Sequence, residues 1–279
     1  MTATLSRIAA FTQNPAGGNP AGVWIGDSLP DARTMQQIAR EIGYSETVFI
    51  APAEGLVRTA RYFSPEAEVD FCGHATIATG VVLGEKSGEG RYLLQTKAGD
   101  IPLSVQRQDG HYTAALTSVE PRHQVASTAL VDAALSALGW QPADLDPAIP
   151  PALAFAGNWH LVVAVRAAET LAALDYDFDE LKSLMLQHNL TTLQLIWRES
   201  DGIIHSRNPF PIGGIVEDPA TGAAAAALGG YLRAAGLVLP PASLLIRQGE
   251  AMGRPSQLWL DIPAQGGMVV RGHAVPLPA

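Results

Sequence analysis

The sequence predicts two similar domains that each combine strands with helices. The chain has 279 residues, more than one domain usually holds, and fits two domains of about 100–150 residues each. Two features recur in the same order in both halves. Gly18-Asn19-Pro20 and Gly157-Asn158-Trp159 each precede a strand-like run, and Cys72-Gly73-His74 and Thr221-Gly222-Ala223 each open a helix-like run of small residues. Such repetition indicates duplication of one structural unit.

Strand-like and helix-like segments alternate in the first half. Apolar residues between Met35 and Ile42 share one helical face, and Gly43 suits the end of that helix. The small-residue segment Gly73–Leu83 predicts a buried helix. Segments rich in β-branched and aromatic residues predict strands. The expected strands are Arg7–Phe11, Ala21–Ile25, Glu46–Ile50, Leu56–Phe63, Arg91–Thr96, Ile101–Arg107 and His111–Leu116.

The second half begins after residues 117–127, which contain Pro121 and mark the expected domain boundary. Glycines that follow apolar or alanine-rich runs indicate where its helices end. The expected helices are Thr128–Leu138, Asp179–Gln187 and Thr221–Ala235, and the expected strands are Leu161–Val165, Leu193–Trp197, Ile203–Ser206, Leu244–Arg247, Leu258–Ile262 and Gly267–Val275.

The composition is typical of a soluble chain with a large core, at 47% hydrophobic and 16% charged residues. The formal net charge is −9 and no dense run of Lys or Arg occurs, so we expect no nucleic-acid partner. No apolar run reaches the roughly 18 residues of a membrane helix, and the N-terminus lacks a signal-peptide pattern, so we expect no membrane association. Cys72 is the one cysteine, which excludes disulfides and cysteine-rich zinc sites and favours a cytoplasmic location.

The segment Ile215–Ala223 carries the most functional information. A strand-like run leads to Glu217 and Asp218, and Pro219 and a helix start follow. The first N–H groups of a helix have no internal partner and carry partial positive charge, so this start predicts a site for a carboxylate or phosphate. Gly222 lets a ligand approach the backbone closely. Alternatively Asp218 caps the helix, and the two roles are compatible.

Residues 71–74 form the corresponding site of the first half. His74 at a helix start is suited to bind an anion or transfer a proton, although a single histidine is more often a hydrogen-bonded residue of a polar turn. Cys72 would act as a base if the helix start stabilises its thiolate, and is otherwise a small buried apolar residue. We expect the two helix starts to face one cleft between the domains, with an anion bound near Gly73 and Gly222.

Glu46 is the candidate acid/base. The alternation of residues 44–50 places Glu46 on the same strand face as Val48 and Ile50, a face that is normally buried. Burial of a carboxylate favours its protonated form, which suits a group that must take a proton and return it. The alternative is an outward-facing glutamate at a strand edge.

Several short motifs occur together over nearly the whole chain. They are Phe11-Thr12 with Gly18–Val23, Ser45-Glu46-Thr47, Arg61–Pro65, Glu68–Thr76, Ser206–Phe210 and Glu217–Gly222. In this combination the chain resembles the PhzF-like proteins, which are named for the phenazine-biosynthesis isomerase and have the diaminopimelate epimerase fold.

The resemblance implies an α+β fold of two pseudo-symmetric domains, each a curled, mostly antiparallel sheet around a central helix. The central helices would be Gly73–Lys86 and Thr221–Ala235. Residues 1–117, joined by the C-terminal strand 267–279, would form the first domain, and residues 118–266 the second.

The resemblance also implies a function. It implies an isomerase that shifts a proton on a small carboxylate-bearing metabolite in the interdomain cleft, without a metal or an organic cofactor, and it suggests a homodimer. The acid/base glutamate of the namesake enzyme matches Glu46, and its substrate-contacting histidine and aspartate match His74 and Asp218. The same motifs contain the expected substrate-binding residues, Asn19, Ser45, Cys72, Gly73, Thr221, Gly222 and Ala223.

Two departures from related enzymes leave alternatives open. The namesake has a serine at the position of Ala223, so a hydroxyl contact is lost here, and we do not expect its dihydro-hydroxyanthranilic acid substrate to carry over. Diaminopimelate epimerases use two cysteines, of which the first matches Cys72 but the second falls on Thr221, whose hydroxyl is too weak an acid or base unaided. The alternatives are a racemase or epimerase that uses Cys72 with another group, and a binding protein that has lost turnover.

Overall fold

A computed structural model describes residues 3–278 of the chain, which divide into two compact units. Unit 1 contains the described residues up to Thr117 and those from Arg271 onward, and unit 2 is Ser118–Val270. The last strand, β16 (Val269–Pro276), begins in unit 2 and continues in unit 1. The chain therefore leaves unit 1, completes unit 2 and returns to unit 1.

Unit 1 contains a closed sheet of mixed strand direction. Its strands are β1 (Thr4–Ala10), β2 (Asn19–Ile25), β3 (Glu46–Pro52), β4 (Val57–Phe63), β5 (Glu68–Val69), β6 (Gly90–Thr96), β7 (Gly99–Gln108) and β8 (His111–Thr117). The strand order is β1-β2-β3-β4-β6-β7-β8-β16, and β16 also pairs with β1, which closes the ring. The pairs β2–β3 and β4–β6 are parallel, whereas β1–β2, β3–β4, β6–β7 and β7–β8 are antiparallel.

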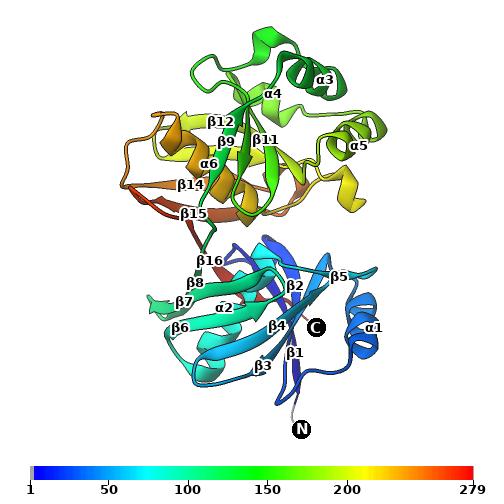
Figure 1. The fold of residues 1–279 in the computed structure, drawn as a ribbon, viewed down its shortest axis with the longest axis vertical. Helices are drawn as coiled ribbons and strands as arrows, with labels where there is room; N and C mark the ends of the chain where they lie inside the picture. Colours follow the sequence, from blue (N-terminus) through cyan, green and yellow to red (C-terminus); the bar gives the residue numbers. More distant parts are fainter. Residues whose placement is uncertain (1–2, 279) are drawn as a thin grey trace. The chain divides into compact units, whose positions relative to one another are not determined.

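Helix α2 (Gly73–Ser87) lies inside this sheet (Figure 1) and contacts β1, β2, β3, β7 and β8. Every residue from His74 to Gly84 is buried, so the expected buried helix is confirmed. Small residues let the surrounding strands approach closely. A Cβ atom added at Gly80 would lie 2.5 Å from the Cβ atom of Ala114, and one added at Gly84 would lie 2.6 Å from the ring of Tyr112.

Helix α1 (Ala32–Ile42) packs its apolar face on the sheet of unit 1. Met35 is buried there against Phe49 of β3, as the sequence periodicity predicts. The helix ends at Gly43, which has the left-handed backbone conformation (φ 70°) that glycine adopts without strain. This ending leads the chain within three residues to Glu46, the first residue of β3.

Unit 2 contains a second mixed sheet. Its strands are β9 (Arg122–Val125), β10 (Ala152–Phe155), β11 (Trp159–Val165), β12 (Thr192–Ser200), β13 (Ile203–Arg207), β14 (Ala242–Gln248) and β15 (Ser256–Ile262), in the order β9-β10-β11-β12-β13-β14-β15-β16. Along β10-β11-β12-β13-β14-β15 the pairs alternate between antiparallel and parallel, beginning and ending antiparallel. The same succession occurs along β1-β2-β3-β4-β6-β7 of unit 1, so the repetition noted in the sequence extends to the strand topology.

Helix α6 (Gly222–Ala234) is the counterpart of α2. It packs against β9, β10, β11, β12 and β15, and it is buried from Ala224 to Leu232. Helices α3 (Thr128–Leu138) and α5 (Phe178–Gln187) bury Leu135 and Met185 in one apolar cluster with Leu161 of β11 and Leu195 of β12. The remaining helical segments are α4 (Ala168–Ala172) and the 3₁₀ turns Pro142–Asp144, Pro211–Gly213 and Glu250–Met252.

Some expectations from the sequence need correction. Residues 117–127 are more than a boundary, because they contain β9, and β10 and α4 are further elements that the pattern did not indicate. All four residues of β9 are exposed, so the strand has no buried face to produce an alternating pattern. Helix α6 begins at Gly222, with Thr221 as its N-cap residue. Among residues 3–278 no helix is long and apolar enough to span a membrane.

Candidate functional site

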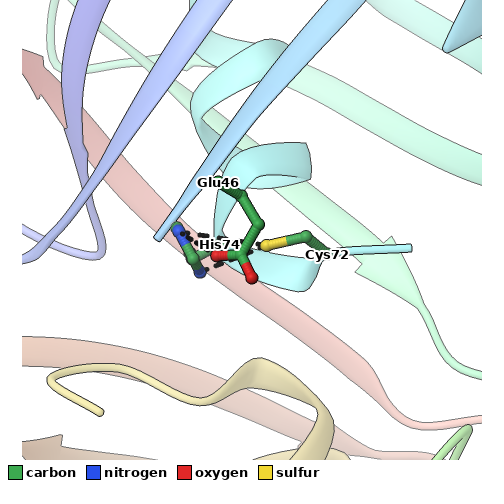
Figure 2. A group of neighbouring side chains, drawn as sticks. All are labelled: Glu46, Cys72 and His74. Atoms are coloured by element: carbon green, nitrogen blue, oxygen red, sulfur yellow. Dashed lines mark hydrogen bonds and ion pairs between the residues drawn. The ribbon is translucent and has the colours of Figure 1, made fainter. Parts of the chain in front are cut away.

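Glu46, Cys72 and His74 form a compact cluster in unit 1. Figure 2 shows their side chains pointing toward one another from the start of β3 and the start of α2. Oε2 of Glu46 lies 3.5 Å from Nε2 of His74, and Sγ of Cys72 lies 3.3 Å from Nδ1 of the same ring. The side chains of Glu46 and His74 are 20% and 6% exposed, so the carboxylate reaches solvent while the imidazole is buried. The imidazole therefore contacts a carboxylate and a thiol at once.

Hydrogen bonds at the start of α2 fix Cys72 and His74 in place. The hydroxyl of Thr76 donates to the carbonyl oxygen of Cys72 at 2.7 Å, and the backbone N–H of Thr76 donates to the same oxygen at 3.1 Å. The Thr76 hydroxyl also bonds to the phenol of Tyr62 on β4 at 2.8 Å. Burial raises the pKa of Tyr62 above its ordinary value, so the phenol stays neutral. The side chain of N-cap residue Cys72 makes no capping bond and is directed to His74 instead.

The other expected residues of unit 1 lie close to this cluster along the chain or in the sheet register. Oγ of Ser45 lies 3.4 Å from Nε2 of His74. Gly73 is the first residue of α2. Asn19 is buried at the start of β2, two residues before Ala21, which is the register partner of Glu46 on the parallel strand β3. These residues therefore share one end of the unit 1 sheet.

The same cluster has the geometry of a metal-ligand set. Glu46, Cys72 and His74 each offer one ligand atom, and the three atoms lie within 4.8 Å of one another. It is the one group of three His, Cys, Asp or Glu ligands that residues 3–278 bring together in this way. The absence of a resident metal, which the PhzF resemblance implies, stays a prediction.

Asp218 and Thr221 form a second cluster, in unit 2, at the start of α6. The hydroxyl of Thr221 donates to Oδ2 of Asp218 at 2.6 Å, and Gln248 at the end of β14 binds both residues. Gln248 is 1% exposed. Its amide nitrogen donates to the carbonyl oxygen of Asp218 at 2.7 Å and to Oγ1 of Thr221 at 2.9 Å. Its amide oxygen accepts from the backbone N–H of Thr221 at 3.1 Å. Gly222 is buried and Ala223 is partly exposed in the first turn of the helix. Asp218 thus bonds to the N-cap residue through the hydroxyl of that residue.

A partly buried ion pair supports the segment that precedes Asp218. The guanidinium of Arg207 at the end of β13 donates to both carboxylate oxygens of Glu217, with a shortest distance of 2.6 Å to Oε2. Glu217 is 3% exposed, so this carboxylate is neutralised in the interior. The backbone N–H of Asp218 donates to the carbonyl oxygen of Asn208 at 3.0 Å. Glu217 therefore anchors the turn, while Asp218 keeps a partly exposed side chain.

Asn208 also belongs to a buried network of polar side chains. Its amide donates to Oε1 of Gln194 at 2.6 Å and to Oγ1 of Thr192 at 3.1 Å, and Nδ1 of His160 lies 2.9 Å from that same hydroxyl. His160 is fully buried, which lowers its pKa to about 3, so the ring is neutral at ordinary pH. Within the described chain, Nε2 of His160 has no hydrogen-bond partner.

The structure assembles the sequence-predicted residues into two groups, each within one unit. Asn19, Ser45, Glu46, Cys72, Gly73 and His74 belong to unit 1, and Asp218, Thr221, Gly222 and Ala223 belong to unit 2. Gln248 was not expected from the sequence. It follows an expected strand, and its contact with Thr221 depends on a sheet register that no local pattern reveals.

Comparison with solved structures defines the class of fold. The PhzF-family phenazine biosynthesis protein of Bacillus anthracis superposes with a TM-score of 0.85 at 24% identity, over 100% of this chain and 98% of that chain. The described units therefore have the PhzF fold, consistent with the α+β architecture that the resemblance implied. The topology is a mixed, barrel-like sheet in unit 1 around its helix.

Sequence comparison then places the chain in a family. The family model for phenazine biosynthesis-like protein matches residues 8–278. The uncharacterized isomerase YfhB of Bacillus subtilis is 31% identical over 276 residues, 96% of this chain and 93% of its own. The trans-2,3-dihydro-3-hydroxyanthranilate isomerase of Pseudomonas fluorescens is 31% identical over 268 residues, 95% of this chain and 92% of its own. The chain belongs to the phenazine biosynthesis-like (PhzF) family.

Proposed function

We propose that the protein is an isomerase that shifts a proton on a small carboxylate-bearing metabolite, with Glu46 as the general acid/base. Relatives across nearly the full length of the chain are named isomerases, which supports the reaction class. The observation that carries the proposal is the 3.5 Å approach of Glu46 Oε2 to His74 Nε2 at the start of α2. We propose that the reaction uses no metal and no organic cofactor.

Glu46 is suited to this task by its position. Its side chain is 20% exposed, so a substrate can reach the carboxylate, while the adjacent imidazole of His74 is 6% exposed. In the proposed reaction Glu46 removes a proton from a carbon next to a carboxylate or carbonyl group and returns it to another carbon of the same conjugated system. One group then both breaks and forms a C–H bond, without a second base. Because the carboxyl group is partly exposed, its proton can exchange with solvent between the two steps.

His74 and Asp218 have supporting roles in the proposal. His74 binds the substrate and assists protonation, and Asp218 contacts a polar group of the substrate. The backbone N–H groups of Gly73, Gly222 and Ala223 stabilise the developing negative charge, because the first N–H groups of a helix have no partner within the helix. We propose that the residues of both units contribute to the same reaction.

Proton exchange with deuterated water tests this proposal without knowledge of the product. Candidate cyclic and amino acids are incubated with the protein, and deuterium uptake is followed by mass spectrometry. Glu46→Gln keeps the shape and removes the titration, so we expect exchange to fall by a factor on the order of 10² to 10⁴, with little change in ligand affinity. The matched control is Glu54→Gln, which makes the same change at an exposed position after β3 and should exchange like the wild type. A folded Glu46→Gln protein that exchanges at the wild-type rate would remove Glu46 from the mechanism.

A racemase or epimerase that uses Cys72 is the second candidate. Sγ of Cys72 lies 3.3 Å from Nδ1 of His74. Many enzymes activate a nucleophilic thiol with a histidine within this distance. The hydroxyl of Thr221, which stands where related epimerases have a second cysteine, already donates to Asp218 at 2.6 Å, which argues against a two-base mechanism. Exchange that survives in Glu46→Gln and vanishes in Cys72→Ala would favour the epimerase. Tight binding of a candidate acid with no exchange in the wild type would favour a binding protein that has lost turnover.

The remaining expectations stay predictions of the same proposal. We propose that the protein binds a small anionic metabolite as its substrate. We also propose that it forms a homodimer, so that a second copy of the chain is its other partner. A cytoplasmic location and the lack of nucleic-acid and membrane partners likewise rest on composition and charge.

A further inference from the structure

We propose that Glu46, Cys72 and His74 also form a site for a thiophilic divalent cation, with Zn²⁺ as the probe, and that occupation of this site inhibits the enzyme. Binding of the cation rests on the geometry of the three side chains alone. Only the inhibition rests on the proposed role of Glu46. The two claims therefore have separate tests: metal binding to the three side chains for the first, and loss of proton exchange by the wild type on addition of Zn²⁺ for the second, where unchanged exchange at saturating Zn²⁺ would overturn the inhibition.

The distances between the three side chains suit tetrahedral coordination. Zn²⁺ binds thiolate sulfur at about 2.3 Å and imidazole nitrogen or carboxylate oxygen at about 2.0–2.2 Å, which puts neighbouring ligand atoms about 3.3–3.6 Å apart. Nε2 of His74 lies 3.5 Å from Oε2 of Glu46 and 3.9 Å from Sγ of Cys72. Small movements of the side chains would bring all three atoms into coordination, because no pair of ligand atoms is more than 4.8 Å apart.

The chemistry of the ligands selects the cation. One thiolate, one imidazole and one carboxylate match the preferences of Zn²⁺, whereas Mg²⁺ and Ca²⁺ prefer sets made of oxygen atoms. Binding deprotonates the Cys72 thiol, and the proton leaves to solvent. Three protein ligands leave the fourth position to water, as in zinc sites that keep an open position.

Occupation of the site would block the proposed reaction. A carboxylate oxygen of Glu46 that coordinates the cation cannot accept a substrate proton. The cation would also take the imidazole of His74 away from the substrate, since Nε2 is the nitrogen that faces Glu46. Glu46 and His74 would therefore act in turnover when the metal site is empty and be unable to do so when it is occupied.

Spectroscopy of the Co²⁺ form and calorimetry with Zn²⁺ test the binding. We expect Co²⁺ to produce the near-ultraviolet charge-transfer absorption of a cobalt–thiolate bond in the wild type, and we expect Cys72→Ser to lose it. Zn²⁺ affinity should fall at least about 100-fold in Cys72→Ser, because even outer-shell partners of a metal contribute about 10–100-fold. The matched control is His205→Gln, which removes the imidazole held between Glu199 at 2.6 Å and Glu250 at 3.0 Å in unit 2 and should leave both signals unchanged.

A measurement on the unsubstituted protein guards against misfolded variants. Cys72 is the one thiol of the chain, so Zn²⁺ should slow its reaction with a chromogenic disulfide reagent, and Mg²⁺ should not. Equal Zn²⁺ affinity in wild type and Cys72→Ser, absence of protection of the thiol, or loss of binding in His205→Gln would each overturn the site. If Zn²⁺ binds through Cys72 while Glu46→Gln still exchanges protons normally, the metal site stands and the acid/base proposal fails.

Discussion

The side-chain amide of Gln248 bonds to both the backbone and the hydroxyl of Thr221. Oε1 accepts from the Thr221 N–H at 3.1 Å, and Nε2 donates to Thr221 Oγ1 at 2.9 Å. A third hydrogen bond joins Nε2 to the carbonyl oxygen of Asp218 at 2.7 Å. The three bonds connect the turn from Asp218 to Thr221 to the end of β14. The conformation from which α6 begins is therefore set by a residue that lies 27 positions further along the chain.

Gln248→Met tests the importance of this tie. Methionine has a similar length and makes none of the three bonds, each worth about 0.5–1.5 kcal/mol net, so we expect the free energy of unfolding to fall by about 2–4 kcal/mol. Affinity for substrate anions should fall as well, because the first turn of α6 is released. Urea denaturation and calorimetry measure the two effects. The control is Gln36→Met, which loses a single bond to the Ser64 carbonyl oxygen, and a Gln248→Met protein no less stable than this control would contradict the expectation.

Replacement of Cys72 distinguishes the thiol from the carboxylate. If Glu46 is the base, Cys72→Ala should keep the fold and most of the proton exchange, within about tenfold of the wild type, since only a neighbour of His74 is lost. Deuterium uptake under the conditions used for Glu46→Gln gives the comparison. Protection of the wild type by substrate against a thiol reagent, together with complete loss of exchange in Cys72→Ala, would show that the thiol is the base.

Ala223→Ser restores the hydroxyl that the PhzF-like pattern has at the first turn of α6. Because Ala223 is partly exposed, we expect the free energy of unfolding to change by no more than about 0.5 kcal/mol. A new hydrogen bond to a carboxylate is worth about 1.5–3 kcal/mol, so affinity for trans-2,3-dihydro-3-hydroxyanthranilate should rise about tenfold or more. Calorimetry checks this, with Ala234→Ser at the exposed end of the same helix as the control. Equal affinity in both variants would mean that the ligand does not reach residue 223.

His160 should make the protein less stable in mild acid. Burial lowers its pKa from 6.5 to about 3 in the folded protein, so below pH 6.5 the unfolded chain binds a proton that the folded chain does not. Stability from this residue is thus complete above pH 6.5 and is lost as the pH falls, by about 1.4 kcal/mol for each pH unit. His160→Gln removes the titration.

Denaturation of the wild type and His160→Gln at several pH values measures this effect. We expect the wild type to lose about 1.5–2 kcal/mol relative to the variant between about pH 6.5 and 5. His188→Gln at an exposed helix end should run parallel to the wild type. A constant difference between wild type and His160→Gln over that range would mean that the folded protein also protonates the ring.

Local patterns in the sequence were sufficient for the central helices. A run of small and apolar residues marks α2 because every face of that helix is buried. Strand β3 is buried on both faces from Thr47 to Ala51, and Glu46 is partly exposed at its start, so the burial of this strand does not follow the expected alternation. Contacts between residues far apart in the sequence could not be predicted from local patterns. The motifs contain Arg207 and Glu217, yet nothing in their spacing reveals the ion pair between them. Edge strand β9 was not predicted because all of its residues are exposed, so the sequence has no alternation of buried and exposed positions there.

The course of β16 has a consequence for synthesis of the protein on the ribosome. Unit 2 is one continuous stretch, Ser118–Val270, whereas unit 1 needs the strand that pairs Ala10 with Ala274 and Ile8 with Pro276. Domains usually fold in the order in which they emerge, N-terminal first. Here the N-terminal segment cannot complete its fold when it first emerges, because the residues that close its sheet are translated after the whole of unit 2. Only a chain translated through β16 can complete the unit that carries Glu46, Cys72 and His74, so products terminated before that strand would carry these three residues on an unclosed sheet.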